Sequence, residues 1–130
     1  MDLFLFITHQ EDPLYLPVEL SGLITTSVPK ASFFQIDHHA SSELIQTAIK
    51  AINEASKVVF CIEGKNDGPV QKSLFPIFRQ IVQVKCPAIL LQKGDISLGV
   101  FKNLLSIPQH EVLDFKDVIA RSKEFYNTGK

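Results

Sequence analysis

The sequence predicts a single three-layer α/β/α domain, residues 1–130, with a five-stranded parallel sheet in the flavodoxin-like strand order 2-1-3-4-5. Two observations predict this fold class. Short apolar runs recur five times along the chain, and segments with the apolar period of a helix lie between them. Such alternation favours parallel strands joined by right-handed crossovers, with helices on both faces of the sheet.

The predicted strands are short and almost wholly apolar, as expected of strands that helices cover on both faces. They are Leu3–Ile7, Phe33–Ile36, Val58–Ile62, Ala88–Leu91 and Val112–Phe115. The first four are continuous rather than alternating, and the third has the clearest pattern. The fifth has the weakest pattern, because the polar residues Gln109, His110 and Glu111 precede it.

Three segments have a marked helical period. The clearest is Ser41–Ser56, which a serine at its start can cap. Its apolar stripe comprises Leu44, Ile45, Ala48, Ile49, Ile52 and Ala55. The other two are Leu74–Val84 and Asp117–Asn127, each of which carries its apolar residues on one face.

Prolines and aspartates predict further helix boundaries. The first helix is expected to begin near Pro17, and Pro76 fits the first turn of the helix that follows the third strand. Pro108 is expected to end a fourth helix, between the fourth and fifth strands. Asp114 or Asp117 can cap the last helix.

Composition narrows the function classes. The 45% apolar and 21% charged residues are typical of a globular domain, and a net charge of −1 predicts no attraction to nucleic acid or to an anionic membrane. The sequence contains no run of 18 apolar residues, the length that would predict a membrane-spanning helix. The first residues also lack the basic start of a signal peptide, so a cytoplasmic location is expected. Cys61 and Cys86 lack metal-like spacing and are predicted to be reduced core thiols.

Polar and ionisable residues follow the predicted strands at their carboxyl ends. Ligands of open parallel sheets bind at this edge. The residues expected to line such a pocket are Thr8, His9, Glu63, Lys65, Asp67 and Lys93. Polar loops and helix caps would produce the same pattern without a ligand, so both interpretations stay open.

The segment Asp37-His38-His39 at the end of the second predicted strand indicates a metal site. Carboxylate and imidazole groups suit manganese, zinc or iron, and His9 ends the neighbouring predicted strand. The candidate metal ligands are therefore His9, Asp37, His38 and His39, with a divalent metal as the cofactor. Alternatively, the two consecutive histidines are surface or capping residues that bind no metal.

Locally, these residues resemble the DHH phosphoesterases, a family named after an Asp-His-His at a strand end. That family also has a His-x-x-Pro-Asp-x-Asp-like motif after its first strand, where this chain has ITHQEDP at residues 7–13 and no second aspartate. The resemblance implies a metal-dependent hydrolase of a phosphate ester or anhydride. It further implies Glu63 or Asp67 as a base or additional ligand, and Lys65 or Lys93 as the group that holds phosphate.

Two other functions of this fold class lack their sequence signatures. Flavin or nucleotide binding needs a Gly- or Ser/Thr-rich loop, whereas residues 8–17 contain no glycine and carry Glu11 and Asp12. Phosphoacceptor receiver domains have an acidic pair after strand one and an aspartate after strand three. Thr8-His9 and Glu63 stand at those places here, so phosphotransfer is not predicted.

The helix predicted over Leu74–Val84 has a wide apolar face. Phe75 and Val82 lie at the margins of its stripe, outside the width that packing on a sheet needs, and are candidate interface residues. Either a neighbouring helix covers them or they bind a second copy or a protein partner. The favoured function is therefore a non-catalytic regulatory or protein-interaction module that forms a homodimer, and the alternative is the metal-dependent hydrolase.

Overall fold

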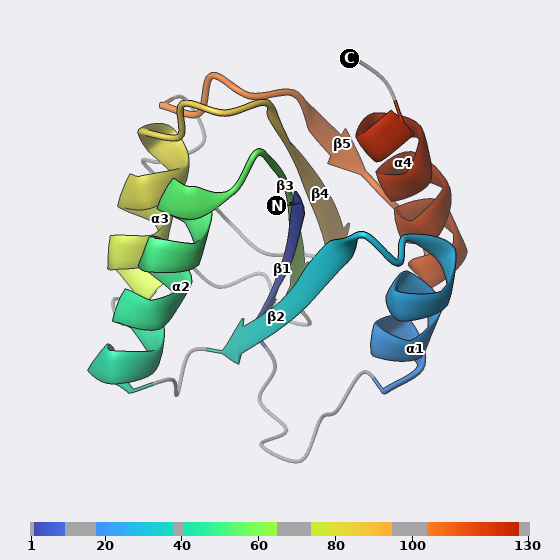
Figure 1. Cartoon of the computed structure of the whole chain (residues 1–130), viewed down its shortest axis with the longest axis horizontal. Coiled ribbons are helices and arrows are strands. Elements are labelled where there is room, and N and C mark those ends of the chain that lie inside the picture. The colour runs from blue at the N-terminus through green and yellow to red at the C-terminus, as the bar shows by residue number, and fades with distance from the viewer. Residues whose placement is uncertain (1, 10–17, 38–40, 65–73, 95–103, 128–130) are drawn as a thin grey trace.

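The computed structural model describes residues 2–9, 18–37, 41–64, 74–94 and 104–127 (Figure 1). The strands are β1 (Asp2–His9), β2 (Ala31–Asp37), β3 (Lys57–Gly64), β4 (Ala88–Gly94) and β5 (Gln109–Glu111). The helices are α1 (Val18–Ser27), α2 (Ser42–Glu54), α3 (Phe75–Val82) and α4 (Phe115–Asn127).

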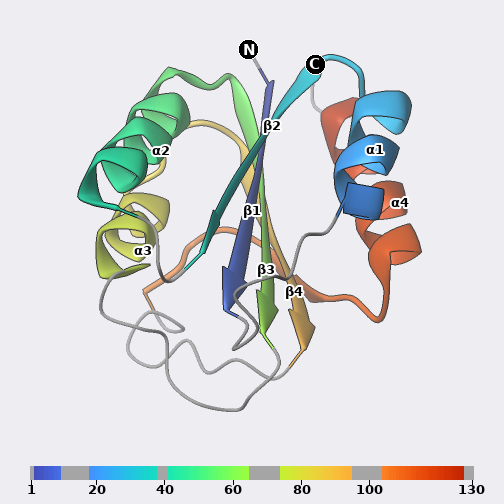
Figure 2. The same cartoon turned by 90° about the horizontal axis from the view of Figure 1, so that it is seen from below.

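The sheet is parallel throughout and has the order β2-β1-β3-β4-β5, which confirms the predicted fold class. The first strand thus lies inside the sheet, between β2 and β3. Figures 1 and 2 show α2 and α3 on one face of the sheet and α1 and α4 on the other. No helix in the described ranges is long and apolar enough to cross a bilayer.

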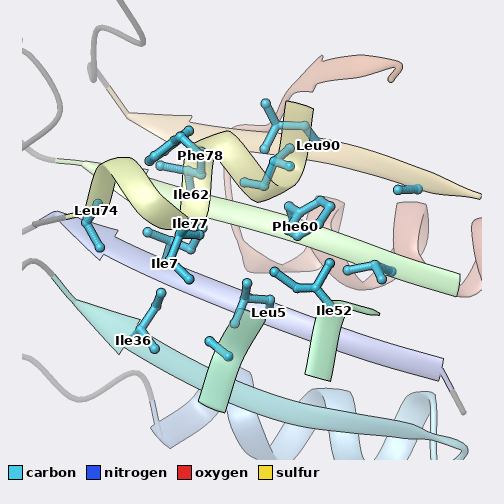
Figure 3. Packing of buried hydrophobic residues seen from close by; sticks show 14 of the residues in the cluster. Leu5, Ile7, Ile36, Ile52, Phe60, Ile62, Leu74, Ile77, Phe78 and Leu90 are labelled. Carbon is cyan, nitrogen blue, oxygen red and sulfur yellow. The ribbon is translucent and has the colours of Figure 1, made fainter. Parts of the chain in front are cut away.

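Strand alternation divides the core into two layers. On β1, Leu3, Leu5 and Ile7 pack toward α2 and α3 (Figure 3), whereas Phe4 and Phe6 pack on the opposite face with residues of α1 and α4. All five side chains are buried, which explains why the sequence of this strand is continuously apolar. Cys61 of β3 belongs to the α1/α4 layer.

Local signals place most helix boundaries where the sequence predicts them. The Ser41 hydroxyl accepts a hydrogen bond from Leu44 N at 3.2 Å and caps α2. Pro76 lies in the first turn of α3. Asp114 rather than Asp117 caps α4, since Asp114 Oδ1 accepts from Asp117 N at 3.0 Å.

The predicted bounds of two elements are wrong. The fifth strand is not Val112–Phe115 but the polar segment Gln109–Glu111, and α4 already begins at Phe115. Val112 is buried as predicted, but in the connection between the two elements. A helix ending at Pro108 is also not found: residues 104–108 are not helical, and 95–103 lie outside the described residues.

The end of α4 is tied to the start of the sheet. Lys57 Nζ at the beginning of β3 donates to the carbonyl oxygens of Tyr126 at 3.2 Å and Phe125 at 3.4 Å. The Tyr126 hydroxyl donates to the carbonyl oxygen of Leu3 on β1. The two Lys57 contacts satisfy carbonyl groups at the end of a helix, which otherwise lack partners.

Candidate functional site at the carboxyl edge of the sheet

Four strand ends meet in one row at the carboxyl edge of the sheet. Thr8 is the register partner of Asp37 on β2 and of Glu63 on β3, and Glu63 is the partner of Lys93 on β4. The arrowheads of β1, β3 and β4 mark this edge in Figure 2. The topology thus brings Thr8, Glu63 and Lys93 of the predicted pocket together, although their role in ligand binding stays a prediction.

This row lies on the α1/α4 side of the sheet. Thr8, Glu63 and Lys93 each follow by two positions a member of the α1/α4 core layer on the same strand, and side chains two apart share a face. Phe115, the first residue of α4, stands beside the row, with its ring centroid 6.3 Å from that of Phe6. The start of α4 therefore borders the candidate site.

Glu63 and Lys93 form an ion pair within this row. Lys93 Nζ lies 2.9 Å from Glu63 Oε2, and the exposed fraction of the side chain is 27% for the lysine and 5% for the glutamate. The same ammonium group lies 5.1 Å from the centroid of the Phe115 ring, a cation–π geometry. The carboxylate and the ammonium thus neutralise each other, and the aromatic ring helps to fix the lysine.

Thr8 is the third polar residue of the row, and its side chain is almost fully enclosed. Its exposed fraction is 3%, and its Oγ1 atom has no hydrogen-bond partner within the described part of the chain. A buried hydroxyl without a partner costs free energy. The Thr8 hydroxyl can therefore bond a polar group at this edge of the sheet.

Cys61 lies on β3 two positions before Glu63 and is wholly buried. Burial raises the pKa of its thiol far above the usual range, and the Glu63 carboxylate raises it further, while Lys93 acts in the opposite direction. The thiol is therefore protonated at neutral pH and unsuited to nucleophilic attack, in agreement with the prediction of a core thiol. Cys86 is half-buried, and burial raises its pKa as well.

Most of the predicted metal site lies outside the described residues. This applies to His38 and His39, and also to Lys65 and Asp67 of the predicted pocket. His9 and Asp37 end β1 and β2 in neighbouring register positions, but the structure describes only their backbone. Within the described ranges no three His, Cys, Asp or Glu side chains are grouped to hold a metal, and the metal site stays a prediction.

The candidate interface residues Phe75 and Val82 are both half-buried at the margin of the core. The opposite margin of α3 contacts α2, where Gln80 Nε2 donates to Asn53 Oδ1 at 2.5 Å. At 100° per residue, Gln80 lies roughly 140–160° around the helix from Phe75 and Val82. The helix α2 therefore packs on the other side of α3 and does not cover this margin.

Sequence reasoning missed a hollow at the opposite, amino edge of the sheet. It has a volume of about 340 Å³, and Lys30, Lys57 and Lys123 are among its lining residues. Two of these lysines stand beside the first residue of a strand, Lys30 just before β2 and Lys57 at the start of β3. The position of these two lysines at strand starts can be recognised in the sequence. The contribution of Lys123 from α4 becomes apparent only in the folded chain.

Comparison with known proteins finds similarity to solved structures only. No family model and no curated protein matches the sequence. Among solved structures, the chain is similar to the flavodoxin-like domain of a Synechococcus protein, with a TM-score of 0.48, 16% identity, and coverage of 92% of this chain and 91% of that one. It is also similar to a Fusobacterium nucleatum flavodoxin bound to flavin mononucleotide, with a TM-score of 0.44, 10% identity, and coverage of 84% and 68%.

The class of protein follows from the structure itself. A parallel sheet in the order β2-β1-β3-β4-β5 with helices on both faces is the flavodoxin-like, doubly wound α/β fold. This fold serves many unrelated functions, so the function has to be argued from the residues at its edges and surfaces.

Proposed function

We propose that the chain is a non-catalytic regulatory or protein-interaction module that forms a homodimer through the outer margin of α3. The observation that carries this proposal is the ion pair between Glu63 and Lys93 at 2.9 Å. A general base or a phosphate-binding ammonium group has to be available to the substrate. Here Glu63 and Lys93, one candidate for each role, are engaged with each other, which favours a contribution to stability over a part in turnover.

The outer margin of α3 supports self-association. Phe75 and Val82 are seven residues apart and so lie on one side of the helix, with the exposed Arg79 between them. Both side chains are half-buried and retain apolar surface outside the core. A two-fold axis beside this margin would pack the same residues of two copies against each other, as in most homodimers.

Equilibrium sedimentation tests this proposal. The wild-type protein is expected to show a monomer–dimer equilibrium at tens of micromolar, which Val82→Arg shifts to monomer. Arg79→Glu is a second test variant that leaves the apolar core untouched, because Arg79 is exposed. Leu113→Arg is the matched control, since this leucine is 88% exposed between β5 and α4, and the control is expected to remain dimeric.

Two outcomes would contradict the proposal. A wild-type protein that is strictly monomeric at these concentrations removes self-association. A melting temperature that rises by roughly 8 °C with millimolar manganese, zinc or magnesium, the increase expected of a tightly bound ligand, and that loses this rise in a His38→Ala, His39→Ala variant, supports the metal-dependent hydrolase instead.

A further inference from the structure

The hollow at the amino edge of the sheet, opposite to the edge that carries the Thr8 row, is lined by residues of four elements (β1, α1, β3 and α4) and of the connection that follows α1. It lies where β1 begins, beside residues 27–30 at and after the end of α1 and the last residues of α4, and has a volume of about 340 Å³. Small-molecule sites in proteins typically begin at roughly 300 Å³, so the hollow is large enough for a small ligand. Its charged lining residues are Asp2, Lys30, Lys57 and Lys123.

The charges of this lining are unbalanced. Three ammonium groups face one carboxylate, in a chain whose net charge is −1. Lys30 and Lys123 are exposed and form no ion pair with any residue that the structure describes. A hollow with a local excess of positive charge attracts anions and raises their local concentration.

Lys57 differs from Lys30 and Lys123 because it binds the end of α4. Its ammonium group donates to the last carbonyl groups of α4 and lies 5.7 Å from the centroid of the Phe125 ring. At the end of α1, the carbonyl oxygens of Ile24 and Val28 accept from Val28 N and Ala31 N. These carbonyl groups at the helix ends are engaged, so they compete less strongly with a bound anion for Lys30 and Lys123.

We propose that this hollow binds a small molecule that carries a phosphate or a similar multivalent oxyanion. Lys30, just before β2, and Lys123 of α4 bind the oxyanion, and Lys57 stabilises the end of α4 beside them. This site is independent of the proposed dimer, because the hollow lies on the α1/α4 side of the sheet and α3 lies on the other.

Isothermal titration calorimetry with inorganic pyrophosphate at low ionic strength tests the site. We expect saturable binding of one pyrophosphate per chain, and an affinity at least tenfold lower in the Lys30→Gln, Lys123→Gln variant. The matched control is Lys50→Gln, Lys85→Gln, which removes two exposed lysines from the opposite side of the molecule with the same change in net charge. Its affinity is expected to stay within about twofold of wild type.

Three outcomes would overturn the proposal. They are the absence of saturable binding to the wild-type protein, an equal loss in the two double variants, and unchanged binding in the Lys30→Gln, Lys123→Gln variant. An equal loss would indicate attraction by net charge instead of a site. All four substituted lysines are exposed, so the variants are expected to fold, and their melting curves check this. Acetylation of Lys30 and Lys123 by acetic anhydride gives a second reading, since bound pyrophosphate is expected to slow it.

Discussion

At the carboxyl edge of the sheet, the effect of Glu63 on stability depends on the presence of Lys93. The glutamate side chain is only 5% exposed, and an ionised carboxylate loses much hydration free energy when it leaves water. The ammonium group at 2.9 Å offsets part of that loss. Removing one partner therefore differs in its effect from removing both, because a single substitution leaves a charge in a buried position.

Lys93→Met is expected to lower the free energy of unfolding by about 2–4 kcal/mol, because the Glu63 carboxylate then lacks its ammonium partner. The double variant Glu63→Gln, Lys93→Met is expected to recover most of that loss, since no buried charge remains. Urea denaturation of both variants measures the difference. Equal losses in the single and double variants would show that the pair contributes nothing beyond its packing.

The sequence predicts the members of this row but not their pairing. Thr8, Glu63 and Lys93 stand out as polar residues directly after apolar runs, and the rule for parallel sheets brings them to one edge. Whether a side chain is paired, buried or without a partner depends on neighbours that are far apart in the chain. The Oγ1 atom of Thr8, which has no hydrogen-bond partner among the described residues, and the ring of Phe115 near Lys93 therefore could not be predicted.

Among the elements, α4 is connected to the sheet by hydrogen bonds at its C-terminal end. Its C-terminal carbonyl groups accept hydrogen bonds from Lys57, and Tyr126 donates to the Leu3 carbonyl of β1. Burial raises the pKa of the Tyr126 hydroxyl far above its usual value, and the Asp2 carboxylate raises it further, while a backbone hydrogen bond involving Val59 lowers it. The helix is thus attached through a group that has to remain protonated.

Tyr126→Phe is expected to lower the free energy of unfolding by about 1–2 kcal/mol at pH 7, because the hydrogen bond from the Tyr126 hydroxyl to the carbonyl oxygen of Leu3 is lost. The pH dependence follows from the raised pKa. Since the folded state holds the proton more tightly than the unfolded state, this stabilisation is complete below the ordinary tyrosine pKa of 10.0 and is lost as the pH rises above it. Urea denaturation between pH 7 and 11 is expected to give a steeper decline for wild type than for Tyr126→Phe, and parallel curves would contradict this.

Elements differ in how well the sequence predicts them. The four strands from β1 to β4 are predicted because each is apolar on both faces. The fifth is misplaced because Gln109–Glu111 pairs with β4 alone and is largely exposed, so no apolar pattern marks it. Val112, in the connection, and Phe115, in the first turn of α4, both pack in the core. Their apolar side chains produce a sequence pattern that resembles a strand.

The molecule has one cysteine inside the α1/α4 core layer and a second at the margin of the α2/α3 core layer. Cys61 is wholly buried and Cys86 is half-buried, and both are free thiols. Their different access to solvent makes them reporters of different motions. Cys61 becomes reactive only when the sheet loses its α1/α4 cover, whereas Cys86 needs only a local change.

In the Cys86→Ser variant, whose remaining cysteine is Cys61, a disulfide reagent such as DTNB is expected to react only with globally unfolded molecules. The rate should rise with urea in proportion to the unfolded fraction. In Cys61→Ala, the thiol of Cys86 is expected to react without denaturant. A Cys61 that reacts in water as fast as in urea would contradict the two-layer packing around β3.

The hydrogen bond between Tyr126 and Leu3 joins residues that are 123 positions apart, and it bears on how the chain folds during its synthesis. Translation produces β1 first, yet both neighbours of this strand and the helix that locks its beginning are made later. Phe4 and Phe6 cannot be fully covered until residues 115–127 have emerged from the ribosome. Throughout that interval β1, which is apolar at every position from Leu3 to Ile7, lacks part of its cover. We therefore expect a nascent chain of this protein to be a substrate for chaperones until α4 has been made.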